Sequence, residues 1–592
     1  MARESRQPRR ERGGRSSTSG FERYVSRGSN RAFVVVVLFG VIALIFFARL
    51  VFLQVIVADS WAADAEKSRT ISYPLEPRRG TIYDRNGHVL AISVDATTVY
   101  VNPKEVEEPG VTSRAVAETL GGSPADYIDD ISRNERAAYI RIASKVDVDK
   151  AQALKEKELP GLYFVDDMRR EYPYGQTGGQ VIGACSVAVD EEKNREYYEG
   201  ICGLELYYDT ILAGTVGYYE AEVGADGTPI PGGVHESTKQ PVEGQDIVIS
   251  LDIEFQEEVE KSLGDGLKRI GTKGGSAVVM DATNGEIYAA ASVPFFNPAD
   301  RSEVPEGSMQ LKPATNLFEP GSIFKTVSAT AILEAETMTP DTEVFCPAYL
   351  EADGYIVADA HERDDITYTF RDIIKYSSNV GISLSVEDNL GFAPFYDDIL
   401  KYRFNQLTGI DYPGEQLGYL LDFDRWSRVQ GINVTFGQGI SMNAMQIVAF
   451  YGALINDGVM QTPHFLVRKP QTNEVPTYET HEIIDNKSAI PPMLSMLESV
   501  VTDGTGTDAQ IEGYTVAGKT STAEIYDEVN GGYREDAYNL AFNGFILDSN
   551  SPFVCFVGGD AVSGDRPVVF IFHDIMEAAI NRYNITSNER GE

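Results

Sequence analysis

At 592 residues the chain is too long for one compact domain, and its 43% hydrophobic and 24% charged content excludes the fibrous and the fully disordered classes. The net charge of −38 is unevenly distributed, because residues 1–31 carry nine arginines against three glutamates, a balance of +6, and the remainder sums to −44. A body that acidic repels phosphate backbones, which argues against nucleic acid as a partner of the folded part.

The first elements in chain order are a basic tail and an apolar span. Residues 1–31 are rich in Arg, Ser and Gly, which is typical of a solvated tail, although such a tail could also bind nucleic acid. The uncharged run AFVVVVLFGVIALIFFA, with its continuation past Arg49, covers residues 32–58 and can cross about 30 Å of hydrocarbon. We expect an uncleaved anchor with a cytoplasmic N-terminus and the acidic bulk outside. A signal peptide cleaved at WAADA (61–65) and a buried core helix are the weaker alternatives.

The four cysteines do not form a disulfide scaffold or a zinc motif. Cys185 and Cys202 lie 17 residues apart in one Gly-rich region, so an exported protein could pair them. Free buried thiols are at least as compatible with the sequence.

Residues 59–245 mix short strands, charged helical stretches and glycine-marked turns, which predicts a mixed α/β domain. RRGTIYDRNGHVLA (78–91) predicts two strands joined at its Asn-Gly pair, because Asn-Gly supplies the positive φ of a tight hairpin. VDKAQALKEKEL (148–159) predicts a helix. A turn, a β-branched run and an amphipathic helix in residues 241–263 indicate a domain boundary.

Residues 246–592 predict an α+β domain. SAVVMDATNGEIYAAAS (276–292) contains two apolar runs around an Asn-Gly turn and predicts an antiparallel hairpin. Helical patterns fill residues 322–465, and three apolar strand patterns follow, YTVAGKTSTAEI, NLAFNGFIL and PFVCFVGG. Strands first and last around a helical middle predict a sheet closed by segments distant in the sequence.

The stretch EPGSIFKTVSA (319–329) offers a candidate nucleophile. Ser322 is expected in the first turn of a helix, where serine is an ordinary N-cap. The N-cap interpretation leaves Lys325 unexplained, because a helix N-terminus favours an anion. At i and i+3 the two side chains share a helix face, so the amine could take a proton from the hydroxyl beside N–H groups that favour an oxyanion. Ser-x-x-Lys alone arises often by chance.

Two later stretches add polar side chains of the same kind. KYSSNVG places Ser377 and Asn379 in a predicted loop, where an Asx or Ser turn is the alternative. VAGKTSTAEI predicts a strand, for which the alternative is an edge strand guarded by a lysine. Its polar positions include Lys519, Thr520 and Thr522.

Ser-x-x-Lys, Ser-x-Asn and Lys-Thr-x in this order are far more specific together than any one of them, and they resemble the motif set of penicillin-binding proteins and class A β-lactamases. The chain is identified as a member of the class B penicillin-binding proteins, membrane-anchored peptidoglycan D,D-transpeptidases, with greatest likeness to the division branch. Further family-like segments extend over nearly the whole chain after the anchor: RRGTIYDRNG (78–87), GLELYYDTILAG (203–214), TFGQGISMNAMQI (435–447) and DGTGTDA (503–509).

This resemblance implies four parts: a tail (1–31), an anchor (32–58), a dimerisation-type pedestal (59–245) and a transpeptidase domain (246–592). The implied transpeptidase fold is α+β and like that of serine β-lactamases, with an antiparallel sheet flanked by helices and a helical subdomain. A mixed α/β pedestal carries it.

The resemblance also implies a mechanism without a metal or organic cofactor. Ser322 attacks the penultimate D-Ala carbonyl of a stem peptide ending in D-Ala-D-Ala, with Lys325 as base, and terminal D-Ala leaves. Ser377 passes a proton to the leaving amine, and Asn379 orients the substrate amide. Lys519 lowers the pKa of Lys325 and, with Thr520, holds the substrate carboxylate. The N–H groups of Ser322 and Thr522 form the oxyanion hole, and an amine of a neighbouring stem peptide then takes the acyl group.

One position departs from the family pattern, since Ser521 stands where the third motif usually has glycine. A glycine would let the substrate backbone approach the strand closely. On a strand, however, the Ser521 side chain should point to the face opposite Thr520 and Thr522. We therefore expect the enzyme to retain its activity, whereas this substitution leaves its affinity for β-lactams undecided.

The implied partners are a separate membrane glycan polymerase and division proteins, because the chain leaves no segment for a polymerase domain, and β-lactams are the expected covalent inhibitors. Two alternatives remain: a D,D-carboxypeptidase or β-lactamase that uses water as acceptor, and a catalytically silent scaffold. The large pedestal argues against a free hydrolase. The complete set of motif side chains argues against the scaffold.

Overall fold

The computed structural model describes residues 21–58, 61, 70–132, 140–190, 195–222, 237–526, 533–563 and 567–587. Most of the basic tail and most of WAADA lie outside these residues. The chain forms two compact units. One contains the N-terminal helix and the strands at residues 70–75, 217–222 and 237–239, and the other contains the remaining elements.

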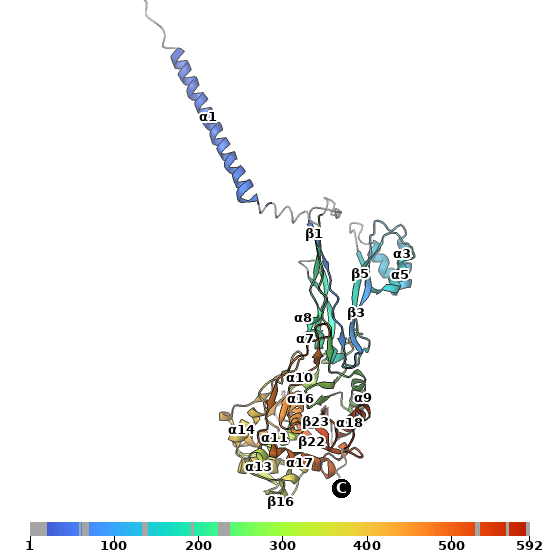
Figure 1. The fold of residues 1–592 in the computed structure, drawn as a ribbon, viewed down its shortest axis with the longest axis vertical. Helices are drawn as coiled ribbons and strands as arrows, with labels where there is room; N and C mark the ends of the chain where they lie inside the picture. The colour runs from blue at the N-terminus through green and yellow to red at the C-terminus, as the bar shows by residue number, and fades with distance from the viewer. Residues whose placement is uncertain are drawn as a thin grey trace, which may run out of the picture. The chain divides into compact units, whose positions relative to one another are not determined.

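The first unit carries the expected apolar span. Helix α1 (Phe21–Val51) continues into a short π-helical segment, η1 (Phe52–Ile56). Its stretch Arg31–Ile56 is 26 residues long with a mean hydropathy of 2.9, which makes it the one helix among the described residues that is long and apolar enough to cross a membrane. β1 (Thr70–Leu75), β8 (Gly217–Glu222) and β9 (Ser237–Lys239) form an antiparallel sheet (Figure 1).

The pedestal part of the second unit is built on long β-strands. The predicted strand–turn–strand at 78–91 is confirmed as β2 and β3 with Gly87 at φ +92°, and the predicted helix at 148–159 as α5. β3 pairs with both β4 and β5, and β2 pairs with β10, which in turn pairs with β20. The strands are β2 (Ile82–Tyr83), β3 (Val89–Val101), β4 (Ile140–Asp147), β5 (Leu162–Glu171), β6 (Ala184–Asp190) and β7 (Arg195–Cys202). β10 (Ile247–Ile249) and β20 (Leu466–Arg468) extend the sheet of β2 from the part of the chain after residue 245. The helices are α3 (Pro109–Leu120), α4 (Pro124–Ser132), α5 (Val148–Lys155), α6 (Gly179–Ile182), α7 (Gly203–Tyr207) and α8 (Asp209–Leu212).

A five-stranded antiparallel sheet organises the C-terminal part, in the order β12-β11-β24-β23-β22. The predicted hairpin at 276–292 is confirmed as β11 (Gly274–Asp281) and β12 (Ile287–Val293). The three late strand patterns are β22 (Thr515–Tyr526), β23 (Tyr533–Leu547) and β24 (Phe553–Val562). The sheet therefore joins segments from both ends of the domain, as expected, and leaves β22 at its edge.

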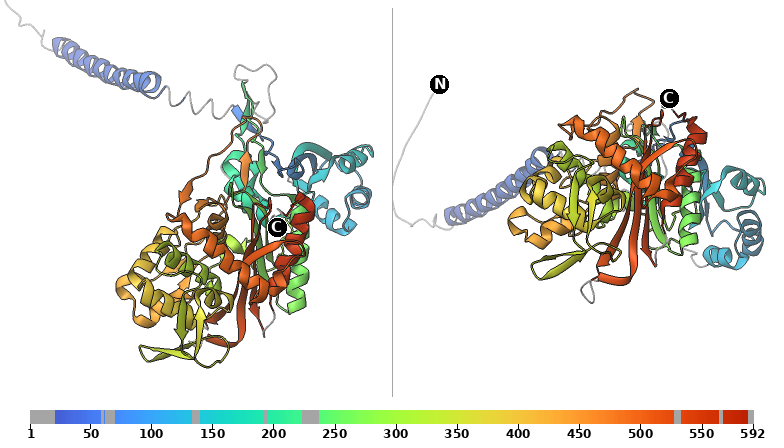
Figure 2. Two further views of the ribbon diagram at one scale, coloured as in Figure 1. Left: turned by 60° about the horizontal axis from the view of Figure 1, so that its bottom comes forward. Right: turned by 90° about the horizontal axis from the view of Figure 1, so that it is seen from below.

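Two hydrophobic cores lie on opposite faces of this sheet because neighbouring residues of a strand point to opposite sides. Val278 and Met280 of β11 face the helical middle, whereas Ala277 and Val279 face α9 (Ile253–Ile270) and α18 (Val569–Tyr583). Figure 2 shows green α9 and red α18 on one side of the strands and the yellow helices on the other.

The middle of the domain is helical, as predicted, but it also contains short hairpins that the sequence did not indicate, among them β13–β16 and β14–β15. The helices are α10 (Lys312–Thr315), α11 (Lys325–Glu334), α12 (Phe370–Lys375), α13 (Asn379–Asn389), α14 (Phe392–Lys401), α15 (Arg428–Thr435), α16 (Ala444–Ile455) and α17 (Ile490–Asp503). The short strands are β13 (Glu343–Cys346), β14 (Tyr349–Ala352), β15 (Tyr355–Ala358), β16 (Ile366–Thr369), β17 (Tyr419–Leu420), β18 (Ile440–Ser441), β19 (Val459–Gln461) and β21 (Thr480–Glu482).

Candidate active site

The candidate nucleophile Ser322 lies in one turn of 3₁₀ helix, η2 (Gly321–Phe324), which leads directly into α11. Gly321 has a φ of +54°, and a β-carbon there would come within 2.6 Å of the Ser521 hydroxyl oxygen, so only glycine fits the position. No side chain caps the start of η2 or of α11. The N-cap interpretation of Ser322 is therefore wrong.

Lys325 is completely buried at the start of α11, and a neighbouring loop holds its amine. Nζ lies 2.5 Å from the carbonyl oxygen of Ser377, 3.2 Å from Ser377 Oγ and 2.7 Å from Asn379 Oδ1. Burial, and after it the nearby Lys519 cation, hold the pKa of Lys325 well below its ordinary value. The environment thus favours the neutral amine that a general base requires.

Ser377 sits between α12 and α13 with a φ of +63°, a left-handed conformation that serine rarely adopts. Its Oγ lies 3.2 Å from Lys325 Nζ and accepts a hydrogen bond from Lys519 Nζ at 3.0 Å. The neighbouring Ser378, not Ser377, caps α13. The local turn-forming role considered for this loop therefore belongs to Ser378, and the Ser377 hydroxyl bridges the two lysines.

Lys519 is also completely buried, although it stands on the edge strand β22. Its Nζ donates to Ser377 Oγ at 3.0 Å and to Thr520 O at 3.1 Å. Burial lowers the pKa of Lys519 to about 7. A lysine without exposed surface cannot keep another chain off a strand edge, so the edge-guard interpretation is wrong.

The three residues after Lys519 alternate as a strand requires. Thr520 Oγ1 lies 2.7 Å from Thr505 Oγ1, and Thr522 is exposed at the cleft. The Ser521 hydroxyl is buried and donates to the carbonyl oxygen of Pro320 at 2.6 Å. The alternation agrees with the expectation that Ser521 points away from its two threonine neighbours.

These side chains meet at one cavity of about 530 Å³. Both lysines lie beneath its surface, and no carboxylate forms an ion pair with either of them within the described parts of the chain. The cavity lining includes Ser322, Ser377, Asn379, Thr505, Thr520, Ser521 and Thr522. The structure thus brings all eight predicted site residues together, six at the cavity wall and two below it.

Comparison with protein families decides the assignment of the chain. The model of the penicillin-binding protein transpeptidase domain matches residues 275–577, and the model of the penicillin-binding protein dimerisation domain matches residues 74–249. The chain belongs to the class B penicillin-binding proteins.

Individual relatives agree with this assignment. The chain is 31% identical over 538 residues to stage V sporulation protein D of Bacillus subtilis, covering 89% of this chain and 81% of the relative. It is 28% identical over 483 residues to the peptidoglycan D,D-transpeptidase FtsI of Escherichia coli, covering 80% of this chain and 78% of the relative. The crystal structure of penicillin-binding protein 3 from Mycobacterium tuberculosis complexed with aztreonam superposes with a TM-score of 0.66 at 26% identity, covering 86% and 97% of the two chains.

Sequence reasoning missed two residues that support the site of this penicillin-binding protein. Asp359 follows β15 and accepts hydrogen bonds from the Ser378 hydroxyl and from Val380 N, so it fixes the loop that carries Ser377. Arg363 in turn forms an ion pair with Asp359 at 2.6 Å. Both belong to the acidic stretch DAHERDD, which carries no periodic signal. The family-like segment DGTGTDA also lies at the site, because its Thr505 lines the cavity and contacts Thr520.

The pedestal of this penicillin-binding protein holds a second buried charge cluster. The Glu205 carboxylate accepts from Arg79 Nε and from Arg170 Nε, both at 2.7 Å, and from the Cys185 thiol at 3.1 Å. Two of the family-like segments, RRGTIYDRNG and GLELYYDTILAG, therefore meet at this carboxylate. All four cysteines are free and buried, so Cys185 and Cys202 are not paired.

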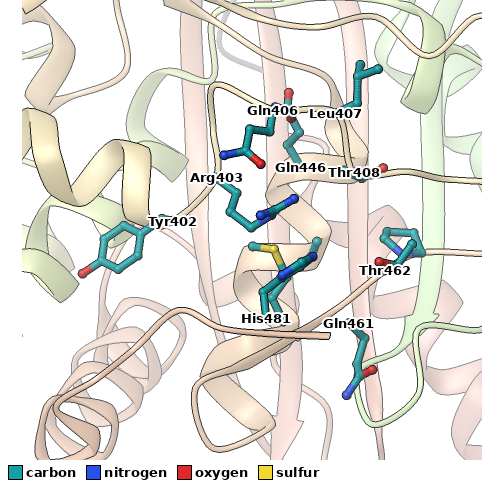
Figure 3. Close-up of a pocket in the computed structure, with 12 residues that line it drawn as sticks. Tyr402, Arg403, Gln406, Leu407, Thr408, Gln446, Gln461, Thr462 and His481 are labelled. Carbon is teal, nitrogen blue, oxygen red and sulfur yellow. The ribbon is translucent and has the colours of Figure 1, made fainter. Parts of the chain in front are cut away.

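A larger cavity, of about 730 Å³, lies elsewhere in the described chain, but its lining, which includes Arg269, Thr507 and His573, contains none of the predicted site residues. Figure 3 shows a small pocket, with Arg403, Gln446 and His481 at its wall, whose volume of about 10 Å³ has room for at most one water molecule. Within the described residues, no group of three or more His, Cys, Asp or Glu side chains is placed to hold a metal ion.

Proposed function

We propose that this class B penicillin-binding protein is a peptidoglycan D,D-transpeptidase that crosslinks stem peptides through an acyl-enzyme on Ser322 during septal wall synthesis. The observation that carries the proposal is the pair of buried lysines around Ser377, directly beneath the cavity that Ser322 lines. A low-pKa amine three residues from a serine hydroxyl is the arrangement that activates a weak nucleophile. The name of the relative FtsI supports the reaction type.

In the acylation step Ser322 Oγ attacks the carbonyl carbon of the penultimate D-Ala, and its proton passes to neutral Lys325. The oxyanion forms beside the N–H groups of Ser322 and Thr522. The C–N bond then breaks as the departing amine of terminal D-Ala takes the proton from Lys325 through Ser377. The contact of 3.2 Å between Lys325 Nζ and Ser377 Oγ supports this proton path.

In the second step the amine of a neighbouring stem peptide attacks the ester carbonyl. Its excess proton returns through Lys325 to Ser322 Oγ as the ester bond breaks, which restores the serine and completes an amide crosslink. Asn379 orients the donor amide, and Lys519 with Thr520 holds the terminal carboxylate. The Ser521 hydroxyl is bonded to the carbonyl oxygen of Pro320, so this residue contributes its backbone to substrate binding along β22.

The proposal extends to placement and partners. The apolar stretch Arg31–Ile56 supports a single-pass anchor in a bacterial cell membrane, with a cytoplasmic tail and an extracytoplasmic catalytic domain. We place the pedestal at residues 59–245 and the transpeptidase domain at 246–592. The proposed partners are D-Ala-D-Ala stem peptides as substrates, β-lactams as covalent inhibitors, a membrane glycan polymerase and division proteins.

The first test is intact mass spectrometry of the full chain in detergent after incubation with a penicillin, next to Ser322→Ala. We expect one added ligand in the wild type and none in the variant. Incubation with a D-Ala-D-Ala peptide and an acceptor amine then separates the possible reactions. A crosslinked product supports the transpeptidase, release of D-Ala without crosslinking supports the hydrolase, and a folded protein that neither acylates nor releases D-Ala supports the silent scaffold.

A further inference from the structure

The serine that replaces the usual glycine of the third motif makes a bond that a glycine could not make. Ser521 Oγ donates to the carbonyl oxygen of Pro320 at 2.6 Å, across 201 residues of sequence. The side chain is 5% exposed, so water does not compete effectively for this bond. Pro320 lies two residues before Ser322, and Ser521 lies directly before Thr522. The bond therefore joins the nucleophile turn to the edge strand.

Other contacts fix the nucleophile turn on its far side. Gly321 N donates to Gly437 O at 3.0 Å, and Gly439 N donates to Glu319 Oε1 at 2.9 Å. Within the described residues, no other hydrogen bond connects segment 320–324 with β22. Among hydrogen bonds, that of the Ser521 hydroxyl is therefore the one that constrains the distance between the turn and the strand in the described part of the chain.

Ser521 lies between two cavities and beside a close contact of the turn with the strand. Ser521, Leu540 and Ala541 line both the active-site cavity and a second cavity of about 250 Å³, which also borders Pro320. The turn also packs closely against β22, because a β-carbon at Gly321 would come within 2.6 Å of Ser521 Oγ and 3.1 Å of the Ala523 β-carbon. The hydrogen bond of Ser521 Oγ fixes the spacing within this close contact.

We propose that Ser521 is a positioning residue, whose bond to Pro320 sets the separation of the two backbone segments that supply the oxyanion donors, Ser322 N and Thr522 N. The inference rests on the proposed function, because it assigns those N–H groups the role of binding the tetrahedral intermediate. The expected kinetic effect falls on the acylation step. Removal of one oxyanion donor elsewhere costs about 10²–10³-fold in rate, so a displaced donor should cost about 10–100-fold.

The experiment compares Ser521→Ala, Ser521→Gly and Ser521→Thr in the full chain in detergent, with stopped-flow acylation by a penicillin. In Ser521→Ala and Ser521→Gly we expect the acylation rate constant to fall about 10–100-fold, with the dissociation constant of the non-covalent complex nearly unchanged. Ser521→Thr keeps the hydroxyl, and the adjacent cavity has room for the added methyl group. It should restore the rate.

A matched control removes a hydroxyl of the same kind elsewhere. Ser250 is fully buried and donates to the backbone carbonyl of Ile287 at 2.7 Å, but it does not line the active-site cavity. Ser250→Ala should lower the melting temperature and leave the acylation rate constant of the folded protein unchanged. An equal loss of rate in both alanine variants would overturn the positioning role.

A spectroscopic measurement separates positioning from general stability. In the acyl-enzyme formed from a penicillin labelled with ¹³C at the reacting carbonyl, two well-placed oxyanion donors weaken the C=O bond and lower its infrared stretching frequency. We expect a higher frequency in Ser521→Ala and Ser521→Gly than in the wild type, and the wild-type value in Ser521→Thr. Unchanged rates and frequencies in the alanine and glycine variants refute the inference while the proposed function stands. Absence of acylation in the wild type removes the proposed function itself.

Discussion

Two buried groups of charged side chains in this molecule differ in whether opposite charges lie beside them. In the pedestal, Glu205 lies between two arginines, so its charge is matched by cations. In the transpeptidase domain, Lys325 and Lys519 share the hydroxyl of Ser377, and within the described residues neither lysine forms an ion pair with a carboxylate. Both groups are removed from water, but only the first has its charge compensated at contact distance.

The pKa values show what this difference does. Burial by itself would raise the pKa of Glu205, but Arg170 and Arg79 lower it to about 2, so the carboxylate stays charged at every physiological pH. Burial lowers the pKa of Lys519 to about 7 and that of Lys325 well below its ordinary value. The charge of Glu205, which two arginines match, therefore belongs to the packed structure of the pedestal. The two lysines have no such partner in the described part of the chain, and their lowered pKa values allow a proton to be transferred during a reaction.

The largest expected effect comes from removing the base of the uncompensated group. Lys325→Met keeps a buried, unbranched side chain but removes the amine, so penicillin acylation should fall by roughly 10²–10⁴-fold. Rapid-quench measurement of the acyl-enzyme checks this rate. An acylation rate within tenfold of the wild type contradicts the role of Lys325 as base.

The same variant also tests how the lowered pKa of Lys325 changes the stability of the fold with pH. A folded state with a lowered lysine pKa binds fewer protons than the unfolded chain, so its stability rises with pH up to the unfolded pKa near 10.4. The melting temperature of the wild type should therefore rise relative to that of Lys325→Met between pH 7 and pH 10. A constant difference would show that the lysine is not deprotonated on folding.

The next effect comes from breaking the compensated group. Glu205→Gln removes the charge that faces two arginines and turns an amide donor toward other donors, which should cost about 3 kcal/mol in stability. Thermal and chemical denaturation of the full chain measures it. Glu387→Gln is the control, because its ion pair with Arg428 is partly exposed and should be worth less than about 1 kcal/mol. Equal losses of stability in the two variants would show that removing a charge from a buried ion pair costs no more than removing one from a partly exposed ion pair.

The smallest expected effect concerns a buried carboxyl group, whose pKa is shifted by burial in the opposite direction to that of a buried lysine. Glu260 accepts hydrogen bonds from Gly178 N and Gln256 Nε2 but forms no ion pair within the described residues, and burial raises its pKa to about 7. Because the folded pKa is raised, Glu260 contributes stability below about pH 4.5, and this contribution is lost as the pH rises through 7.

Glu260→Gln keeps the accepting oxygen and removes the titration. The variant should be more stable than the wild type at pH 8 by about 1–2 kcal/mol, and this advantage should disappear at pH 4.5. Melting temperatures at the two pH values measure the effect. A difference that does not change with pH would show that Glu260 titrates normally in the folded protein.

Local patterns predicted much of the fold correctly. The Asn-Gly pairs of 78–91 and 276–292 mark real hairpins, and the amphipathic pattern after Asp252 is α9. The short strands β13 to β16 were missed because runs of four residues leave no measurable alternation. Their loop carries Asp359, so the support of Ser377 could not be predicted either.

The sequence by itself determined the type and order of the site residues, because Ser-x-x-Lys, Ser-x-Asn and Lys-Thr-x each fit within a few positions of the chain. It also determined the apolar span and the alternation that turns Ser521 away from its neighbours. Only the tertiary structure decided the protonation of the lysines and the bond between Ser521 and Pro320, whose residues lie 201 positions apart. Burial and long-range contact are properties of the packed chain, and they set both the pKa values and the spacing at the nucleophile.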